Sequence, residues 1–247
     1  SNKEILASVK DQYFGDVNDY RKYGLLRLLQ SNGESRLLVA WMLTQDDGSY
    51  DGGLRSYLGD PDKWRRYDHE LFAGLSSLLS SCSPSVSMIE RARLLPRTSF
   101  YTRPVPDGRH ERETWFSDLL ARARHADLVF LDPDNGIEVV STPIGRRNSS
   151  KYVAWSEIKD LWRSDCSILI YQHFPRKPRD VFALGLAREL QVCTGARFVE
   201  AFLTPHVLFL LAAQERHQRQ FREAIALLEQ RWSADQIRPM GLADRSR

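Results

Sequence analysis

A chain of 247 residues is long enough for one large domain or two small ones, and a hydrophobic content of 42% is typical of a globular protein with a substantial core. The sequence has no run of about 18 apolar residues, so we expect no membrane span. The net charge of +3 is mild, and the three scattered cysteines argue against a disulfide framework. The start of the sequence has no signal-peptide pattern, so we expect a cytoplasmic protein.

Helical spacing of apolar residues alternates with short apolar runs through the first half of the chain. In chain order these patterns predict a helix over 17–30, a strand over 37–43, a helix over 68–79, a short strand over 86–89, a strand over 99–102 and a helix over 111–124.

The same alternation continues in the second half. It predicts a strand over 128–131, a helix over 156–162, a strand over 167–171, a helix over 181–190, strands over 198–203 and 207–212, and a final helix over 218–231. The last two strands flank Thr204-Pro205-His206, which is typical of a hairpin turn.

Strands that alternate with helices predict an α/β fold with a doubly wound, mostly parallel, Rossmann-like sheet. The late pair of strands adds an antiparallel hairpin at its end. Such a sheet resembles the fold of class I S-adenosylmethionine-dependent methyltransferases. No linker divides the chain, so we expect one domain over 1–247, with an N-terminal helical extension (1–33) and a small insertion (54–67).

The most informative segment is the strand at 128–131 and the turn that follows it, Asp132-Pro133-Asp134-Asn135-Gly136. Pro133 cannot donate to a sheet ladder, so the strand must stop at Asp132. Asp132, Asp134 and Asn135 then lie at the carboxyl end of a buried strand, where ligands bind in open α/β sheets. These side chains suit either a Mg²⁺ ion or a substrate amine. A turn built by Asp and Asn is the structural alternative.

A second acidic loop, at 46–53, follows the strand at 37–43. Glycines at this position allow a cofactor to approach the backbone closely, although the spacing of a dinucleotide-binding motif is absent. The candidate cofactor-binding residues here are Asp46, Asp47, Gly48, Gly52 and Gly53. A flexible loop is the alternative. With Asp132 and Asp134, the two aspartates would also form an acidic metal site.

Polar and aromatic side chains crowd the segment 14–24, ahead of an apolar helix. Helical spacing puts Asp19, Lys22 and Tyr23 on one face. Capping of the helix by Asn18 or Asp19 is the structural reading.

The strand at 167–171 ends in Tyr171-Gln172-His173-Phe174-Pro175-Arg176. His173 suits acid–base catalysis, with a structural or solvated histidine as the alternative, and Phe174 suits stacking on a base. Arginine far outnumbers lysine and binds phosphate bidentately, which favours a nucleic-acid partner contacted by Arg146, Arg147 and Arg176. A preference for arginine codons explains the excess equally well.

The residues Gly15, Asp19 and Lys22 fall on matching positions of a motif in the bacterial ribosomal-RNA adenine-N6 methyltransferases of the J type, Gly-Asn-His-Ala-Asp-Val-Leu-Lys-His. Tyr23 stands where that family has the last histidine. The segment around Asp132 also resembles the family, whose catalytic Asp-Pro-Pro-Tyr motif lies at the same place. The resemblance implies S-adenosylmethionine as cofactor, with Asp19 beside it, and a nucleic-acid base as substrate.

The chain departs from that family within the catalytic motif, where Asp134-Asn135 replaces Pro-Tyr. The family's tyrosine stacks on a flipped adenine; Phe174 or Tyr23 is the candidate substitute here.

Three hypotheses follow. The first is a methyltransferase that acts on a base amine in nucleic acid, with Asp132, Asp134, Asn135, Lys22 and His173 as catalytic residues. The second is a Mg²⁺-dependent nuclease or phosphoesterase that uses Asp46, Asp47, Asp132 and Asp134. The third is a non-catalytic Rossmann-like binding module.

Overall fold

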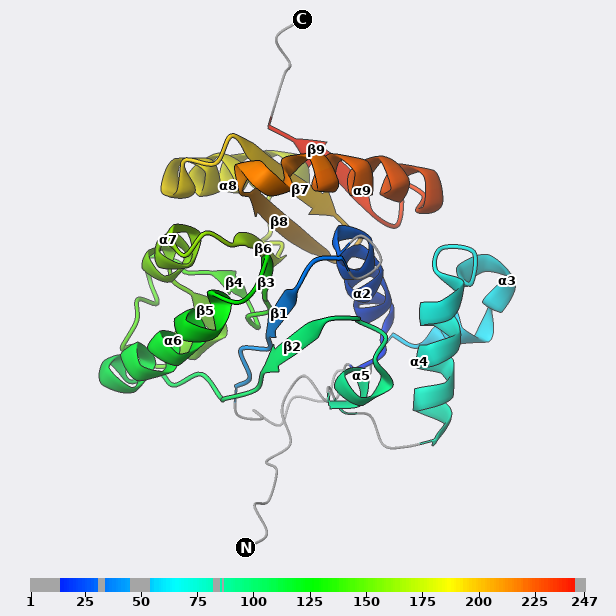
Figure 1. Ribbon diagram of the computed structural model, residues 1–247, viewed down its shortest axis with the longest axis horizontal. Coiled ribbons are helices and arrows are strands. Elements are labelled where there is room, and N and C mark those ends of the chain that lie inside the picture. Colours follow the sequence, from blue (N-terminus) through cyan, green and yellow to red (C-terminus); the bar gives the residue numbers. More distant parts are fainter. Residues whose placement is uncertain (1–13, 31–33, 45–53, 82–84, 86, 243–247) are drawn as a thin grey trace, which may run out of the picture.

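The computed structural model describes residues 14–30, 34–44, 54–81, 85 and 87–242. These residues form a central seven-stranded sheet (Figure 1). In spatial order its strands are β2 (Thr98–Tyr101), β1 (Leu37–Ala40), β3 (Leu128–Leu131), β6 (Ser167–His173), β8 (Val207–Ala213), β7 (Phe198–Leu203) and β9 (Arg238–Gly241).

The strands β2, β1, β3 and β6 run parallel to one another, and β8 is antiparallel to both of its neighbours. The expected α/β architecture, a mostly parallel sheet with a late antiparallel hairpin, is confirmed. The sheet does not end in that hairpin, however, because β9 adds to β7 as an antiparallel edge strand. Pro239 and Gly241 concealed β9 in the sequence, since both residue types are rare in strands except at edges.

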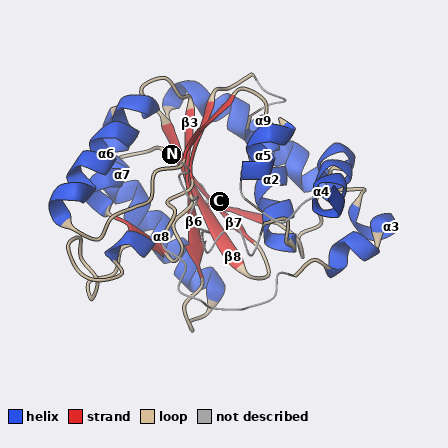
Figure 2. Cartoon of the chain, turned by 90° about the horizontal axis from the view of Figure 1, so that it is seen from below, coloured by secondary structure: helices blue, strands red, loops and turns tan. Residues whose placement is uncertain are grey.

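Helices cover both faces of the sheet (Figure 2). One face carries α2 (Val17–Leu29), α3 (Pro61–Trp64), α4 (His69–Ser81), α5 (Ser87–Ala92) and α9 (Gln218–Arg231); the other carries α6 (Arg109–Ala123), α7 (Trp155–Arg163) and α8 (Arg179–Thr194). Successive residues of a strand therefore place their side chains in two separate hydrophobic cores, one on each face of the sheet. Val39 and Phe130 belong to the first, Leu38 and Val129 to the second.

Short elements complete the fold. The expected insertion at 54–67 contains the 3₁₀ helix η1 (Ser56–Gly59) and α3. Between β3 and α7, β4 (Gly136–Ile137) and β5 (Tyr152–Val153) form a small parallel pair, with η2 (Ser149–Lys151) before β5. A further 3₁₀ helix, η3 (Glu215–His217), precedes α9. No helix in the described ranges has the length and apolar character that crossing a membrane requires.

The predicted strand at 86–89 is wrong, because the helix α5 begins at Ser87. The Ser85 hydroxyl accepts a hydrogen bond from the Ser87 N–H at 3.3 Å, and the Ser85 carbonyl accepts one from the Met88 N–H at 2.9 Å. An apolar run of this length fits a helical turn as well as a strand, and the serine turn decides between them.

The order of the strands places a switch point between β1 and β3. From β1 the chain passes to β2 on one side, and from β2 it crosses to β3 on the other side of β1. Connections that diverge in this way leave a crevice at the carboxyl ends of the two strands, where α/β sheets bind their ligands.

Candidate active site at the carboxyl ends of β1 and β3

Asp132 lies directly after β3, beside the end of β1. Its N–H donates to the Ala40 carbonyl at 3.0 Å, which extends the strand pairing by one residue before Pro133 interrupts it. Asp132 is only 2% exposed. A carboxylate this deeply buried needs a charged or hydrogen-bonding partner, and that partner comes from α2.

The partner is Lys22. Its Nζ lies 3.3 Å from Asp132 Oδ2 and 2.6 Å from Asp19 Oδ1, so one buried ammonium joins two carboxylates. Asp19 and Lys22 are three residues apart on α2, and the Tyr23 hydroxyl lies 3.5 Å from Asp19 Oδ2. The prediction that Asp19, Lys22 and Tyr23 share a helix face is confirmed.

The surroundings of Lys22 stabilise its protonated, positively charged form. Burial lowers its pKa, but the nearby carboxylates of Asp132 and Asp19 outweigh burial, so the pKa lies above the ordinary value. The Nζ atom also lies 5.2 Å from the ring centre of Tyr23 and 5.4 Å from that of Trp41, distances at which aromatic faces stabilise a cation. Lys22 is therefore positively charged at neutral pH.

The turn before α2 orients Asp19. Gly15 has a φ of +75°, and its N–H donates to Asp19 Oδ2 at 2.9 Å. A Cβ at Gly15 would come within 2.5 Å of Leu79, so glycine suits this position on both conformational and steric grounds. Asp16, not Asn18 or Asp19 as expected, is the N-cap of α2: its Oδ1 accepts from the Asn18 and Asp19 N–H groups.

Asp16, Asp19 and Asp132 act on Lys22, and together with Asp134 they act on Tyr171; we call these four aspartates the carboxylate cluster. Burial, followed by the negative charge of Asp19, raises the pKa of Asp16 to about 6. Burial and the charges of all four cluster members raise the pKa of Tyr171 well above its usual value. Lys22 and the Arg21 guanidinium, which interacts with Asp16, are the cations that act on these four carboxylates, so acidic groups outnumber basic ones in the cluster.

The turn after Asp132 is fixed by the neighbouring strands. Asp134 accepts a short hydrogen bond from the hydroxyl of Thr44, in the segment that follows β1. The Asn135 N–H donates to the Lys151 carbonyl at 2.9 Å, and the Asn135 carbonyl accepts from the His173 N–H at 3.0 Å. Gly136, with φ +127°, leaves space that Gln172 fills. Asp132, Asp134 and Asn135 thus lie on one turn between the ends of β1 and β6.

His173 lies beside this turn through its backbone, whereas its side chain is exposed and pairs with the Tyr171 hydroxyl at 3.1 Å. Phe174 packs edge-on against Phe182 of α8, with ring centres 6.4 Å apart, and Arg179 covers its ring at 4.9 Å. Phe174 is therefore part of the packing of α8 on the sheet, as well as a candidate contact for a base.

The three candidate phosphate-binding arginines lie on exposed loops. Arg146 and Arg147 precede η2, and Arg176 follows β6. No described contact joins them to the carboxylate cluster. Asp46, Asp47, Gly48, Gly52 and Gly53 lie outside the described residues, so the predicted cofactor loop and half of the predicted Mg²⁺ site remain predictions. Among the residues that are described, no three His, Cys, Asp or Glu side chains are grouped as metal ligands.

Sequence patterns missed several members of the site. Asp16, Trp41, Thr44 and Tyr171 all contact or influence the carboxylate cluster. Thr44 directly follows the strand predicted at 37–43, which is a usable signal, whereas Trp41 lies within that predicted strand. Tyr171 ends the strand predicted at 167–171 and so carried the same signal, whereas the part Asp16 plays depends on tertiary contacts.

No family model and no curated protein matches the chain. Solved structures with some similarity include protein LPL1258 of Legionella pneumophila strain Philadelphia 1, of family-model DUF519. Its sequence identity is 12%, the match covers 95% of this chain and 98% of that one, and the TM-score is 0.46. Similarity at this level carries no argument about function.

Proposed function

We propose that the protein is an S-adenosylmethionine-dependent methyltransferase that acts on a base amine in nucleic acid. The observation that carries the proposal is the buried carboxylate cluster around Lys22 at the switch point between β1 and β3. Buried ionisable groups with shifted pKa values, located at such a crevice, are typical of functional sites.

The charge of the cluster suits this cofactor. S-adenosylmethionine carries a sulfonium and an ammonium group, and a cluster in which carboxylates outnumber the nearby cations attracts a positively charged group. A dinucleotide would instead bring its negatively charged pyrophosphate to the site.

The topology supports the same proposal. An antiparallel strand, β8, lies between the parallel strands β6 and β7, at the end of the sheet remote from β2. This order resembles the sheet of class I methyltransferases, as does the position of Asp132 at the end of the strand next to β1.

The residues take the following roles in the proposal. Bound S-adenosylmethionine supplies an activated methyl group. Asp132 accepts an N–H of the substrate amine and so turns the nitrogen lone pair toward the reacting carbon, while Lys22 holds the carboxylate in place. Asn135, held by its backbone, presents a second acceptor or donor at the same turn. Positioning of this kind supplies most of the rate in a transfer between two bound groups.

A nucleic acid is the proposed substrate because three arginines are exposed on loops, Arg146 and Arg147 between β4 and β5 and Arg176 after β6. They would contact phosphates and position the strand. Phe174, beside His173, would contact the extruded base.

Transfer of a radiolabelled methyl group to total RNA and to genomic DNA tests the proposal. We expect Asp132→Asn to reduce methyl transfer by about 100-fold or more, which is the range for losing a side chain that binds and orients a reacting proton. Asp127→Asn is the matched control, since Asp127 lies at the opposite end of β3 and pairs with Arg36. Equal activity of the two variants, or no transfer by the wild type to either nucleic acid, would contradict the proposal.

A further inference from the structure

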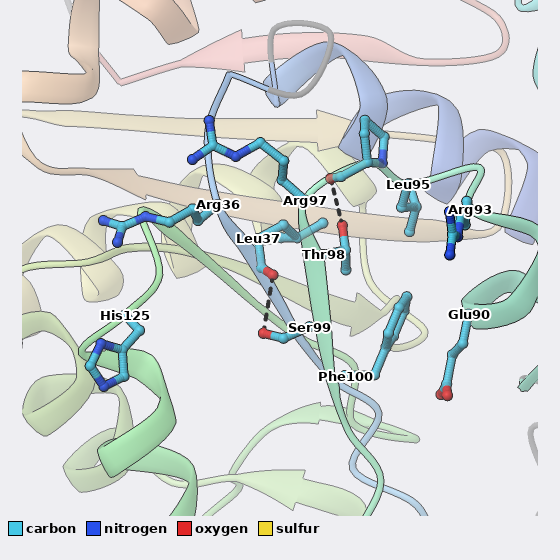
Figure 3. A pocket seen from close by; sticks show the side chains of 11 residues that line it. Arg36, Leu37, Glu90, Arg93, Leu95, Arg97, Thr98, Ser99, Phe100 and His125 are labelled. Atoms are coloured by element: carbon cyan, nitrogen blue, oxygen red, sulfur yellow. Dashed lines mark hydrogen bonds between the residues drawn. The ribbon is translucent and has the colours of Figure 1, made fainter.

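The edge strand β2 forms the floor of an open groove at the border of the sheet. Figure 3 shows the strand running between two walls, one formed by Glu90 and Arg93 around the end of α5, the other by Arg36 and by His125 after α6. The groove has a volume of about 780 Å³. It is separate from the carboxylate cluster, because it extends toward the amino ends of β1 and β2, where Leu37 and Thr98 lie.

The backbone of β2 presents hydrogen-bonding groups to this groove. The Leu37 N–H bonds the Arg97 carbonyl and the Trp41 N–H bonds the Tyr101 carbonyl, so the odd-numbered residues of β2 face β1. The even-numbered residues, Thr98 and Phe100, therefore direct their N–H and C=O groups outward. In the described part of the chain, no strand pairs with this outer edge. An unpaired edge is a template for another strand.

The groove wall is held rigidly. Arg93 and Arg97 have left-handed backbone conformations, with φ values of 53° and 46°, on either side of the turn Leu94-Leu95-Pro96. Arg27 of α2 donates to the Leu94 carbonyl, and Gln30, the C-cap of α2, donates to the Pro96 carbonyl, each at 2.6 Å. Strained backbone persists where its surroundings enforce it, so the groove does not need to be ordered by its ligand.

The charges of the groove select the occupant. Arg36, Arg93 and Arg97 outnumber Glu90, whose carboxylate accepts from the Trp41 indole at 3.0 Å, and Arg36 is paired with Asp127. A small positive excess opposes the pairing of two copies of this chain through β2, since like charges would meet. The same excess is complementary to acidic side chains.

We propose that β2 is a strand-addition site for an extended, acidic peptide segment of a partner protein. The peptide bonds the outward N–H and C=O groups of Thr98 and Phe100, and its acidic side chains pair with Arg93 and Arg97. A nucleic acid is the less favoured occupant, because one of the three arginines is already neutralised and the groove floor offers a strand edge.

Selection from a phage-displayed library of short random peptides on the full-length protein tests the proposal. We expect enrichment of peptides rich in Asp and Glu. Phe100→Pro removes an outward N–H while it leaves the β1–β2 bonds, and edge strands tolerate proline. Its affinity for the selected peptides should fall about tenfold, as for the loss of one hydrogen bond.

Phe100→Leu, which lacks the ring and keeps the N–H, is the matched control and should bind as the wild type does. Arg93→Glu should lower the affinity for acidic peptides and raise the affinity for basic ones. Three results would overturn the proposal: no enrichment of acidic peptides, equal binding by Phe100→Pro and Phe100→Leu, or binding of labelled oligo(dT) that is lost in Arg93→Glu and retained in Phe100→Pro. None of these results depends on methyltransferase activity, so either proposal can fail without the other.

Discussion

Lys22 determines whether the candidate site can exist as a folded arrangement. Its ammonium is the cation that joins Asp19 and Asp132, and its side chain is as buried as that of Asp19, though less than that of Asp132. Two buried carboxylates without it would repel each other and lack solvation. The lysine therefore stabilises the site as well as positioning Asp132.

Replacement of this lysine should be costly. We expect Lys22→Met to lower the free energy of unfolding by about 3 kcal/mol at pH 8, as for other buried ion pairs that lose one partner. The loss should be smaller at pH 5, because Asp16, whose pKa is raised to about 6, then holds a proton and the cluster carries less negative charge. Lys22 itself stays charged at both values, since its pKa is raised. Urea denaturation measures the effect.

Lys159→Met is the control, because Lys159 is exposed on α7. A change in Lys22→Met no larger than in this control, or a larger loss at pH 5 than at pH 8, would contradict the account.

At this scale the sequence predicted what local spacing determines. The face shared by Asp19, Lys22 and Tyr23 follows from the helical repeat, and the turn after β3 follows from Pro133 and Gly136. The pairing of Lys22 with Asp132 joins residues far apart in the chain, so only the folded sheet could reveal it. The N-cap at Asp16 was missed because three polar residues compete for that role over four positions.

At the scale of elements, α2 packs closely against α9. A Cβ at Gly24 would lie 2.3 Å from the Trp232 ring carbon Cζ2, just after α9. We expect Gly24→Ala to destabilise the fold by about 1–3 kcal/mol, the range for overpacked cores. Thermal unfolding measures it.

Gly185→Ala in α8 is the matched control, because a Cβ there meets nothing within 4 Å. That variant should raise stability by up to about 1 kcal/mol through helix propensity. Stabilisation of both variants would contradict the close packing of Gly24 in α2 against Trp232.

The β7–β9 pair introduces a pH dependence. Burial, and then the charge of Glu229, raises the pKa of Glu200 in β7 to about 7. The folded protein therefore holds a proton that the unfolded chain releases, so stability falls as pH rises from about 4.5 to about 7 and is level above that. Glu200→Gln should remove this fall and stabilise the protein at pH 8 by about 2 kcal/mol, with little effect at pH 4.5.

Denaturation of Glu200→Gln and of the exposed control Glu223→Gln across this pH range tests the prediction. Equal pH profiles of the two variants would contradict it.

The elements with strong periodicity were predicted well, including β3, β6, β8 and α9. The errors lie where the pattern is too short or too polar to decide. Residues 86–89 fit either structure until Ser85 starts a helix, and β9 contains a proline and a glycine that only an edge strand accepts. β4 and β5 are two residues long and have no periodicity.

At the scale of the whole molecule, the residues of the candidate site come together because the chain crosses from β2 to β3, on the other side of β1. The sequence predicted that strand ends would carry function, and the topology brings the ends of β1, β3 and β6 together. It also separates two candidate surfaces, the carboxylate cluster at the carboxyl ends and the groove along β2. The sequence could not predict this separation, because it depends on strand order.

The most direct test of the central claim is calorimetric titration of the metal-free protein with S-adenosylmethionine. We predict binding of one equivalent, weakened by at least about tenfold, or 1.4 kcal/mol, in Asp19→Asn, which removes one of the carboxylates. The addition of Mg²⁺ should leave both the binding and the melting temperature unchanged. Absence of heat at millimolar S-adenosylmethionine, or a melting temperature that rises with Mg²⁺ in the wild type but not in Asp132→Asn, would contradict the account.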